Sequence, residues 1–83
     1  MRTKILFFAQ LRELLGCDQI ELDLCESLDI RALINFIIQT HPSWQEHLQS
    51  SQLMCAVNQQ LVGSDTLVKA GDEVAFFPPV TGG

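Results

Sequence analysis

Apolar and polar positions divide this chain into segments with different periods. Residues 4–9 (KILFFA) are almost entirely apolar and contain no turn residue, which predicts a strand buried on both faces in the middle of a sheet. Residues 20–24 (IELDL) alternate between apolar and acidic, the pattern of a strand with one face in water. Residues 74–77 (VAFF) are as apolar as the first segment and stop at Pro78. The two most apolar strands are therefore expected at the two ends of the chain.

A helical period occupies the middle of the chain. Five apolar residues recur at the spacing of one helix face: Ile30, Leu33, Ile34, Ile37 and Ile38. Asp29 can cap the start of this helix. The pair His41-Pro42 ends it, because a residue before proline avoids helical backbone angles. A shorter helix is expected over 11–15 and should stop at Gly16, so the pattern predicts one main helix and one minor helix.

Shorter segments follow the main helix. Residues 44–48 fit one more helical turn, in which Trp44 serves as a packing anchor. Residues 53–57 and 60–62 fit a hairpin that turns at Asn58-Gln59. Gly, Ser and Asp residues then mark a loop before the last strand.

The order of these elements predicts the fold class. If the first and last strands are neighbours, the helical crossover allows them to run parallel, while the hairpins supply antiparallel edges. An α+β fold with a mixed five-stranded sheet around one main helix is the ubiquitin-like β-grasp. We expect this domain over residues 1–77 and an extended tail over 78–83.

Composition narrows the functional classes. The chain has 83 residues, of which 47% are hydrophobic, enough for one domain with its own core. Its formal charge is −5 with only five Lys and Arg residues, so it lacks the basic patch that binds nucleic acid. The acidic surface either steers the chain to a basic partner or serves solubility alone. No segment approaches the roughly 18 apolar residues of a membrane span, and we expect no membrane association.

The cysteines and histidines give no sign of a disulfide framework or a metal site. Cys17, Cys25 and Cys55 are odd in number and widely spaced, which favours a reduced, cytoplasmic setting. They lack a neighbouring base, so a buried apolar role is favoured over a nucleophilic one. His41 and His47 are expected on the surface near the end of the helix. We expect no permanently bound cofactor.

The end of the chain is the strongest candidate for chemistry, because the side chains form no recognisable catalytic motif. Pro78 and Pro79 favour an extended path away from the last strand, and Gly82-Gly83 can enter a narrow channel of another protein. The carboxylate of Gly83 is then the reactive group, which adenylation and a sulfur nucleophile would convert to a thiocarboxylate. The alternative is a frayed terminus without a role.

A second candidate is an apolar surface on the sheet. One main helix covers one face, yet the first and last strands are apolar on both faces. If Phe7 and Phe76 lie under the helix, alternation leaves Phe8 and Phe77 on the other side, joined by Leu61. Such a patch suits a protein partner unless loops or helical turns cover it.

Three stretches resemble one known family. They are residues 7–14 (FFAQLREL), 56–59 (AVNQ) and above all 71–83 (GDEVAFFPPVTGG). With these stretches the chain resembles the small, sulfur-carrier subunits of molybdopterin synthases, which are ubiquitin-like β-grasp proteins. The likeness extends over the whole chain, although residues 17–53 match by pattern more than by identity.

The resemblance implies a sulfur-transfer cycle and a set of partners. A ubiquitin-activating-like adenylyltransferase would use ATP to adenylate Gly83, and a sulfurtransferase would complete the thiocarboxylate. The tail, Pro78, Pro79, Val80, Thr81 and Gly82 included, would enter a large synthase subunit that carries the catalytic side chains. Sulfur would pass to cyclic pyranopterin monophosphate to form the molybdopterin dithiolene. Two large and two small subunits would assemble through a patch that maps onto Phe8, Leu61 and Phe77.

Three other functions stay open at this point. The tail also fits a protein modifier that forms isopeptide bonds, a sulfur carrier for thiamine or tRNA thiolation, or a plain binding module. A modifier would appear as conjugates in cell extracts, and other carriers would not serve the molybdopterin large subunit. A binding module would keep its function without Gly83.

Overall fold

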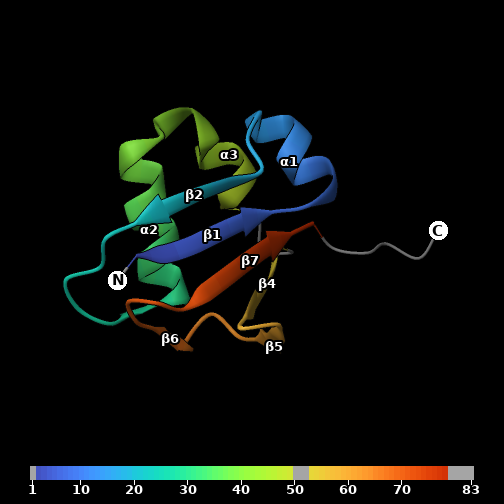
Figure 1. Cartoon of the computed structure of the whole chain (residues 1–83). Coiled ribbons are helices and arrows are strands. Elements are labelled where there is room, and N and C mark those ends of the chain that lie inside the picture. Colours follow the sequence, from blue (N-terminus) through green and yellow to red (C-terminus); the bar gives the residue numbers. More distant parts are fainter. Residues whose placement is uncertain (1, 50–52, 79–83) are drawn as a thin grey trace.

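The computed structural model of the chain describes residues 2–49 and 53–78. Figure 1 shows a curved sheet with the helices gathered on one side of it. The main sheet has the strand order β2-β1-β7-β4-β5. Its strands are β1 (Thr3–Phe7), β2 (Gln19–Leu22), β4 (Met54–Val57), β5 (Gln60–Val62) and β7 (Glu73–Phe77). The helical elements are α1 (Ala9–Leu15), α2 (Ile30–Thr40), a 3-10 turn η1 (Pro42–Trp44) and α3 (Gln45–Leu48).

The two terminal strands lie side by side in the centre of the sheet. β1 pairs with β7 in parallel, with Ile5 opposite Val74 and Phe7 opposite Phe76. β2 and β4 flank this pair in antiparallel orientation, and β5 forms the outer edge beside β4. The predicted β-grasp, with central terminal strands and antiparallel edges, is therefore confirmed.

The main helix α2 begins and ends where the sequence predicts. The side-chain Oδ1 of Asp29 accepts a hydrogen bond of 2.7 Å from the amide of Ala32, which satisfies a helix-start amide that has no partner within the helix. The helix ends at Thr40 and is capped by His41, directly before Pro42. In the minor helix α1, Gly16 takes the left-handed conformation with φ 68° and closes the end as predicted.

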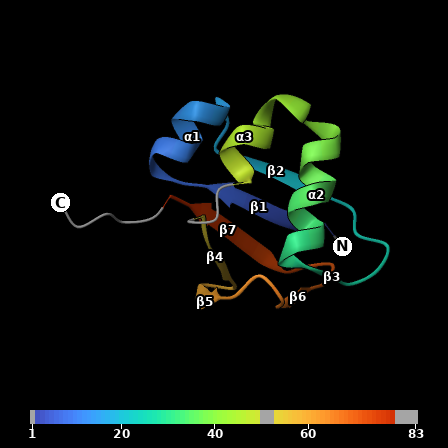
Figure 2. The same ribbon diagram turned by 180° about the vertical axis from the view of Figure 1, so that it is seen from behind.

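The view from behind shows the helices lying across one face of the sheet (Figure 2). The core fills the space between them. Ile5, Phe7, Val74 and Phe76 on the sheet are almost completely buried. The rings of Phe7 and Phe76 stack at 6.3 Å, and the ring of Trp44 meets that of Phe7 edge-on at 5.4 Å. The prediction that Trp44 anchors the irregular segment is thus confirmed.

Some expected boundaries and environments are wrong. Ala9 does not end the first strand but begins α1, and its φ of 56° turns the chain directly from strand into helix. His41 and His47 lie near the end of α2 as expected, but they are partly buried, and the ring of His41 stacks on Trp44 at 3.9 Å. A second, two-stranded sheet formed by β3 (Leu28–Asp29) and β6 (Leu67–Val68) was not expected at all.

Candidate functional site

The face of the sheet that points away from the helices carries a row of small and apolar side chains. Across four strands the register aligns Leu6, Ala75, Ala56 and Leu61. These positions alternate with the buried residues of the core, so they lie on the opposite face. Phe8 and Phe77 extend the row towards the ends of β1 and β7. We call these six residues the open-face patch: Leu6, Phe8, Ala56, Leu61, Ala75 and Phe77.

The open-face patch is accessible to a partner. Phe8 is 45% exposed and Leu61 is 61% exposed, whereas Phe77 is partly buried. All members of the patch except Leu61 line one hollow, together with the polar residues Gln59 and Glu73. As expected, the uncovered face of the sheet carries Phe8, Leu61 and Phe77. Their role in binding stays a prediction.

The patch lies at the end of the sheet from which the tail departs. Because β1 and β7 are parallel, their last residues come to the same edge, where the amide of Phe8 donates to the carbonyl of Phe76 at 3.1 Å. Pro78 follows Phe77 directly and is partly buried. The predicted tail residues Pro79, Val80, Thr81, Gly82 and Gly83 lie outside the described residues.

The opposite end of the same face is charged. Lys4 stands between Glu21 on β2 and Glu73 on β7 in the strand register. One end of the open face is thus apolar and the other carries alternating charges. A partner that covers the whole face would need an apolar surface for the first end and polar groups for the second.

The turn at Asn58-Gln59 borders the patch, which sequence reasoning did not foresee. The side-chain Oδ1 of Asn58 accepts from the amide of Glu73 at 3.0 Å, and its Nδ2 donates to Oδ1 of Asp72 at 3.2 Å. Gln59 lines the hollow together with Phe8 and Phe77. The turn itself was predicted, but its neighbours depend on the pairing of β4 with β7, for which the sequence carries no local signal.

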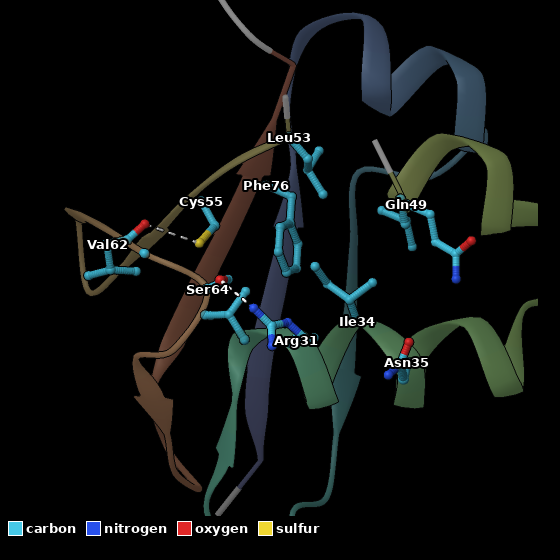
Figure 3. A pocket seen from close by; sticks show the side chains of 12 residues that line it. Arg31, Ile34, Asn35, Gln49, Leu53, Cys55, Val62, Ser64 and Phe76 are labelled. Carbon is cyan, nitrogen blue, oxygen red and sulfur yellow. Dashed lines mark hydrogen bonds between the residues drawn. The ribbon is translucent and has the colours of Figure 1, made fainter. Parts of the chain in front are cut away.

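A larger hollow on the helix side is shown in Figure 3. It has a volume of about 640 Å³ and lies between α2 and the β4–β5 hairpin, with Phe76 among its lining residues. At its mouth Nη2 of Arg31 donates to Oγ of Ser64 at 3.3 Å. Its lining also includes Gln49 and Leu53, the residues directly before and after 50–52, which are not among the described residues.

The thiol of Cys55 in this hollow is poorly suited to nucleophilic chemistry. Cys55 is buried, and its Sγ contacts the carbonyl oxygen of Val62 at 3.7 Å. Burial raises the pKa of the Cys55 thiol above its ordinary value, so the neutral thiol predominates near neutral pH. The buried role expected of the cysteines is confirmed for Cys55, but Cys17 is only partly buried and Cys25 is exposed.

Two further observations concern the parts of the chain that the structure describes. Within residues 2–49 and 53–78, His, Cys, Asp and Glu side chains form no group of three that could hold a metal ion. In the same residues no helix has the length and hydropathy needed to cross a membrane.

Comparison with known proteins connects this geometry to a family. Residues 5–83 match the sequence profile of the ThiS family. The molybdopterin synthase sulfur carrier subunit of Escherichia coli is 46% identical over 96% of this chain and 98% of its own length. The subunit of the same name from Haemophilus influenzae is 44% identical over 95% of this chain and 96% of its own length.

Solved structures agree with the fold. The small archaeal modifier SAMP1 of Haloferax volcanii superposes with a TM-score of 0.83 over the full length of both chains, at 22% identity. A complex of subunits 1 and 2 of the molybdopterin-converting factor from Helicobacter pylori contains a chain that superposes with a TM-score of 0.66, at 25% identity over the full length of both chains. With its match over residues 5–83 and its close curated relatives, this chain belongs to the ThiS family of ubiquitin-like proteins.

Proposed function

We propose that this chain is the sulfur carrier subunit of a molybdopterin synthase and that Gly83 carries the sulfur. The observation that carries the proposal is the continuity between β7 and the tail. The central strand ends at Phe77 beside an exposed apolar patch and runs on into the sequence PPVTGG. Relatives at 44% and 46% identity that bear the name of this subunit support the assignment.

The proposed sulfur chemistry takes place at the carboxylate of Gly83. An adenylyltransferase related to ubiquitin-activating enzymes joins the Gly83 carboxylate to AMP from ATP and releases pyrophosphate. The terminal sulfur of a sulfurtransferase persulfide then displaces AMP, and thiol reduction of the resulting acyl disulfide leaves the thiocarboxylate. Gly82 and Gly83 have no side chains to obstruct either active site.

The partner in sulfur delivery is the large synthase subunit. The described side chains of this chain form no acid/base set in the open-face patch, so catalytic groups come from the partner. Phe8, Leu61 and Phe77 would pack against that subunit, while Pro78 to Thr81 lead Gly83 into its active site. The Helicobacter pylori complex of subunits 1 and 2 supports a partner of this kind. We expect two large and two small subunits.

The acceptor is cyclic pyranopterin monophosphate, which gains two sulfurs to become molybdopterin. Each transfer returns Gly83 to a carboxylate, so each product molecule uses two charged carriers. The cycle belongs to the cytoplasm: all three cysteines of this chain are free thiols, the state that a reducing compartment maintains. Transfer to this acceptor, and not to a thiamine precursor or a tRNA, separates the proposed carrier from other sulfur carriers.

Intact mass spectrometry tests the carrier role. The chain is incubated with the activating enzyme, ATP and a sulfur source, and we expect a mass gain equal to the exchange of one oxygen for one sulfur. Fragmentation should place the sulfur at Gly83. A variant that lacks Gly83 is the matched control and should gain nothing. No gain in the intact chain, with the enzyme active on another carrier, would overturn the proposal.

A substitution on the patch tests the docking surface. Phe77→Arg places a charge in the apolar hollow. We expect the free energy of binding to the large subunit to weaken by about 2 kcal/mol or more. Phe36→Arg is the matched control, because Phe36 is an exposed phenylalanine at 37% on α2, on the helix side of the sheet. Titration calorimetry would measure both. Equal affinities would place the interface elsewhere.

A further inference from the structure

The turn between β4 and β5 has a strained backbone. Asn58 and Gln59 both adopt left-handed angles, with φ of 51° and 70°. Two successive left-handed residues make the hairpin turn whose second position usually carries glycine. Asparagine tolerates this conformation, but in glutamine the Cβ crowds the following carbonyl oxygen. Gln59 therefore occupies a position at which glycine would be more stable.

Asn58 holds this strained turn in place. Its amide donates to the carbonyl of Glu73 at 2.7 Å, and its side chain bonds the amide of Glu73 and the carboxylate of Asp72. Asp72 in turn accepts from the amide of Lys69 at 3.0 Å through its other oxygen. The turn is thus fixed to the start of the central strand β7.

The strain places a polar side chain at the edge of the open-face patch. Gln59 lines the same hollow as Phe8 and Phe77. The next residue, Gln60, pairs with Val57 in the register and lies outside that hollow. Two adjacent glutamines therefore differ in position, and only Gln59 borders the patch.

We propose that Gln59 is a further contact residue of the docking surface and that Asn58 is its positioning residue. The side-chain amide of Gln59 hydrogen-bonds a polar group of the large subunit at the rim of the apolar contact, where protein interfaces place their polar groups. The inference rests on the proposed function, because it takes the large subunit as the partner. It explains why a strained position keeps a side chain that the turn itself does not need.

The adjacent glutamines provide the first test. Gln59→Ala and Gln60→Ala are titrated with the large subunit by calorimetry, next to the unchanged chain and Phe77→Arg. We expect Gln59→Ala to weaken binding about fivefold to tenfold, the effect of one lost interfacial hydrogen bond, and Gln60→Ala to leave it unchanged. Equal affinities of the two variants would overturn the contact. If the unchanged chain does not bind, the proposed function itself fails.

Glycine at position 59 tests the strain separately. Gln59→Gly removes the side chain but accepts the left-handed angle. We expect it to melt at a higher temperature than Gln59→Ala while binding the large subunit as weakly as that variant. If residue 59 served only the structure of the turn, Gln59→Gly would keep its affinity for the large subunit. A melting temperature below that of Gln59→Ala, or wild-type affinity, would contradict the inference.

Exchanging the hydrogen-bonding side chains of Asn58 and Asp72 tests the positioning role of Asn58. Asn58→Asp places a second carboxylate against Asp72 and removes the donor of their hydrogen bond, so binding to the large subunit should weaken. In the double variant Asn58→Asp with Asp72→Asn, the donor and acceptor are exchanged, and the affinity should return towards that of the unchanged chain. Failure of this rescue would exclude the positioning role.

Discussion

Individual residues with left-handed backbone angles mark where the chain reverses. Gly16 was predicted as a helix end, because glycine is the residue that most often stops a helix in this conformation. Ala9 and Gln59 have the same kind of angle but gave no signal, since neither residue type favours it. Their conformations follow from pairings of distant strands: Phe8 still donates to Phe76 on β7 directly before α1 begins.

The raised pKa of Cys55 predicts how stability depends on pH. The folded chain keeps the thiol proton at pH values where the unfolded chain has lost it. This contribution to the free energy of unfolding is complete below the ordinary pKa of 9.0 and decreases as the pH rises above it. Urea denaturation at neutral and alkaline pH would measure the decrease. Cys55→Ala should lose part of the alkaline dependence and the exposed control Cys25→Ala should keep it; identical slopes would contradict this account.

Among the elements, those with a clear period were predictable. The apolar stripe located the main helix α2, and the alternation of residues 20–24 located β2. Continuous apolar runs located the central strands β1 and β7. The pair β3 and β6 was missed because two residues are too short to show a period. It forms where the loop before β6 meets the start of α2, with Ile30 donating its amide to the carbonyl of Thr66 at 3.0 Å.

The two faces of β1 should respond differently to substitution. Ile5 is completely buried and Leu6 only partly. We expect Ile5→Ala to lower the free energy of unfolding by about 2 to 5 kcal/mol, and Leu6→Ala to cost clearly less, because only the first opens a cavity in the core. Chemical denaturation would compare them, with Ile5→Val as the milder core variant at about 1 kcal/mol. Equal losses would mean that the open face is as tightly packed as the core.

At the scale of the whole molecule, we expect the folded body and the tail to have separate roles. The topology was predictable because two strands apolar on both faces can be buried only in the middle of a sheet. The position of Phe8 beside the end of β7 was not, since it depends on the register of the parallel pair β1 and β7, which the sequence leaves open. The division at residue 77 stays a prediction.

Removal of residues 79–83 tests this division. The main sheet ends at Phe77, so we expect the shortened chain to melt at the temperature of the full chain. It should not accept sulfur from the activating system. Removal of residues 74–83, which takes the central strand as well, should abolish the cooperative transition. A large loss of stability in the first variant would show that the tail belongs to the folded body.

The central place of the last strand also has a consequence for biosynthesis. A ribosome produces β1 first and β7 last, yet the two must pair to complete the middle of the sheet. Local helices can form during translation, but the sheet closes only after almost the entire chain has left the exit tunnel, because the contact between its ends spans nearly the whole sequence. A chain released early lacks both its central strand and its terminal glycines. An unfinished product therefore cannot complete the sheet, and under the proposed function it would also lack the group that the activating enzyme adenylates.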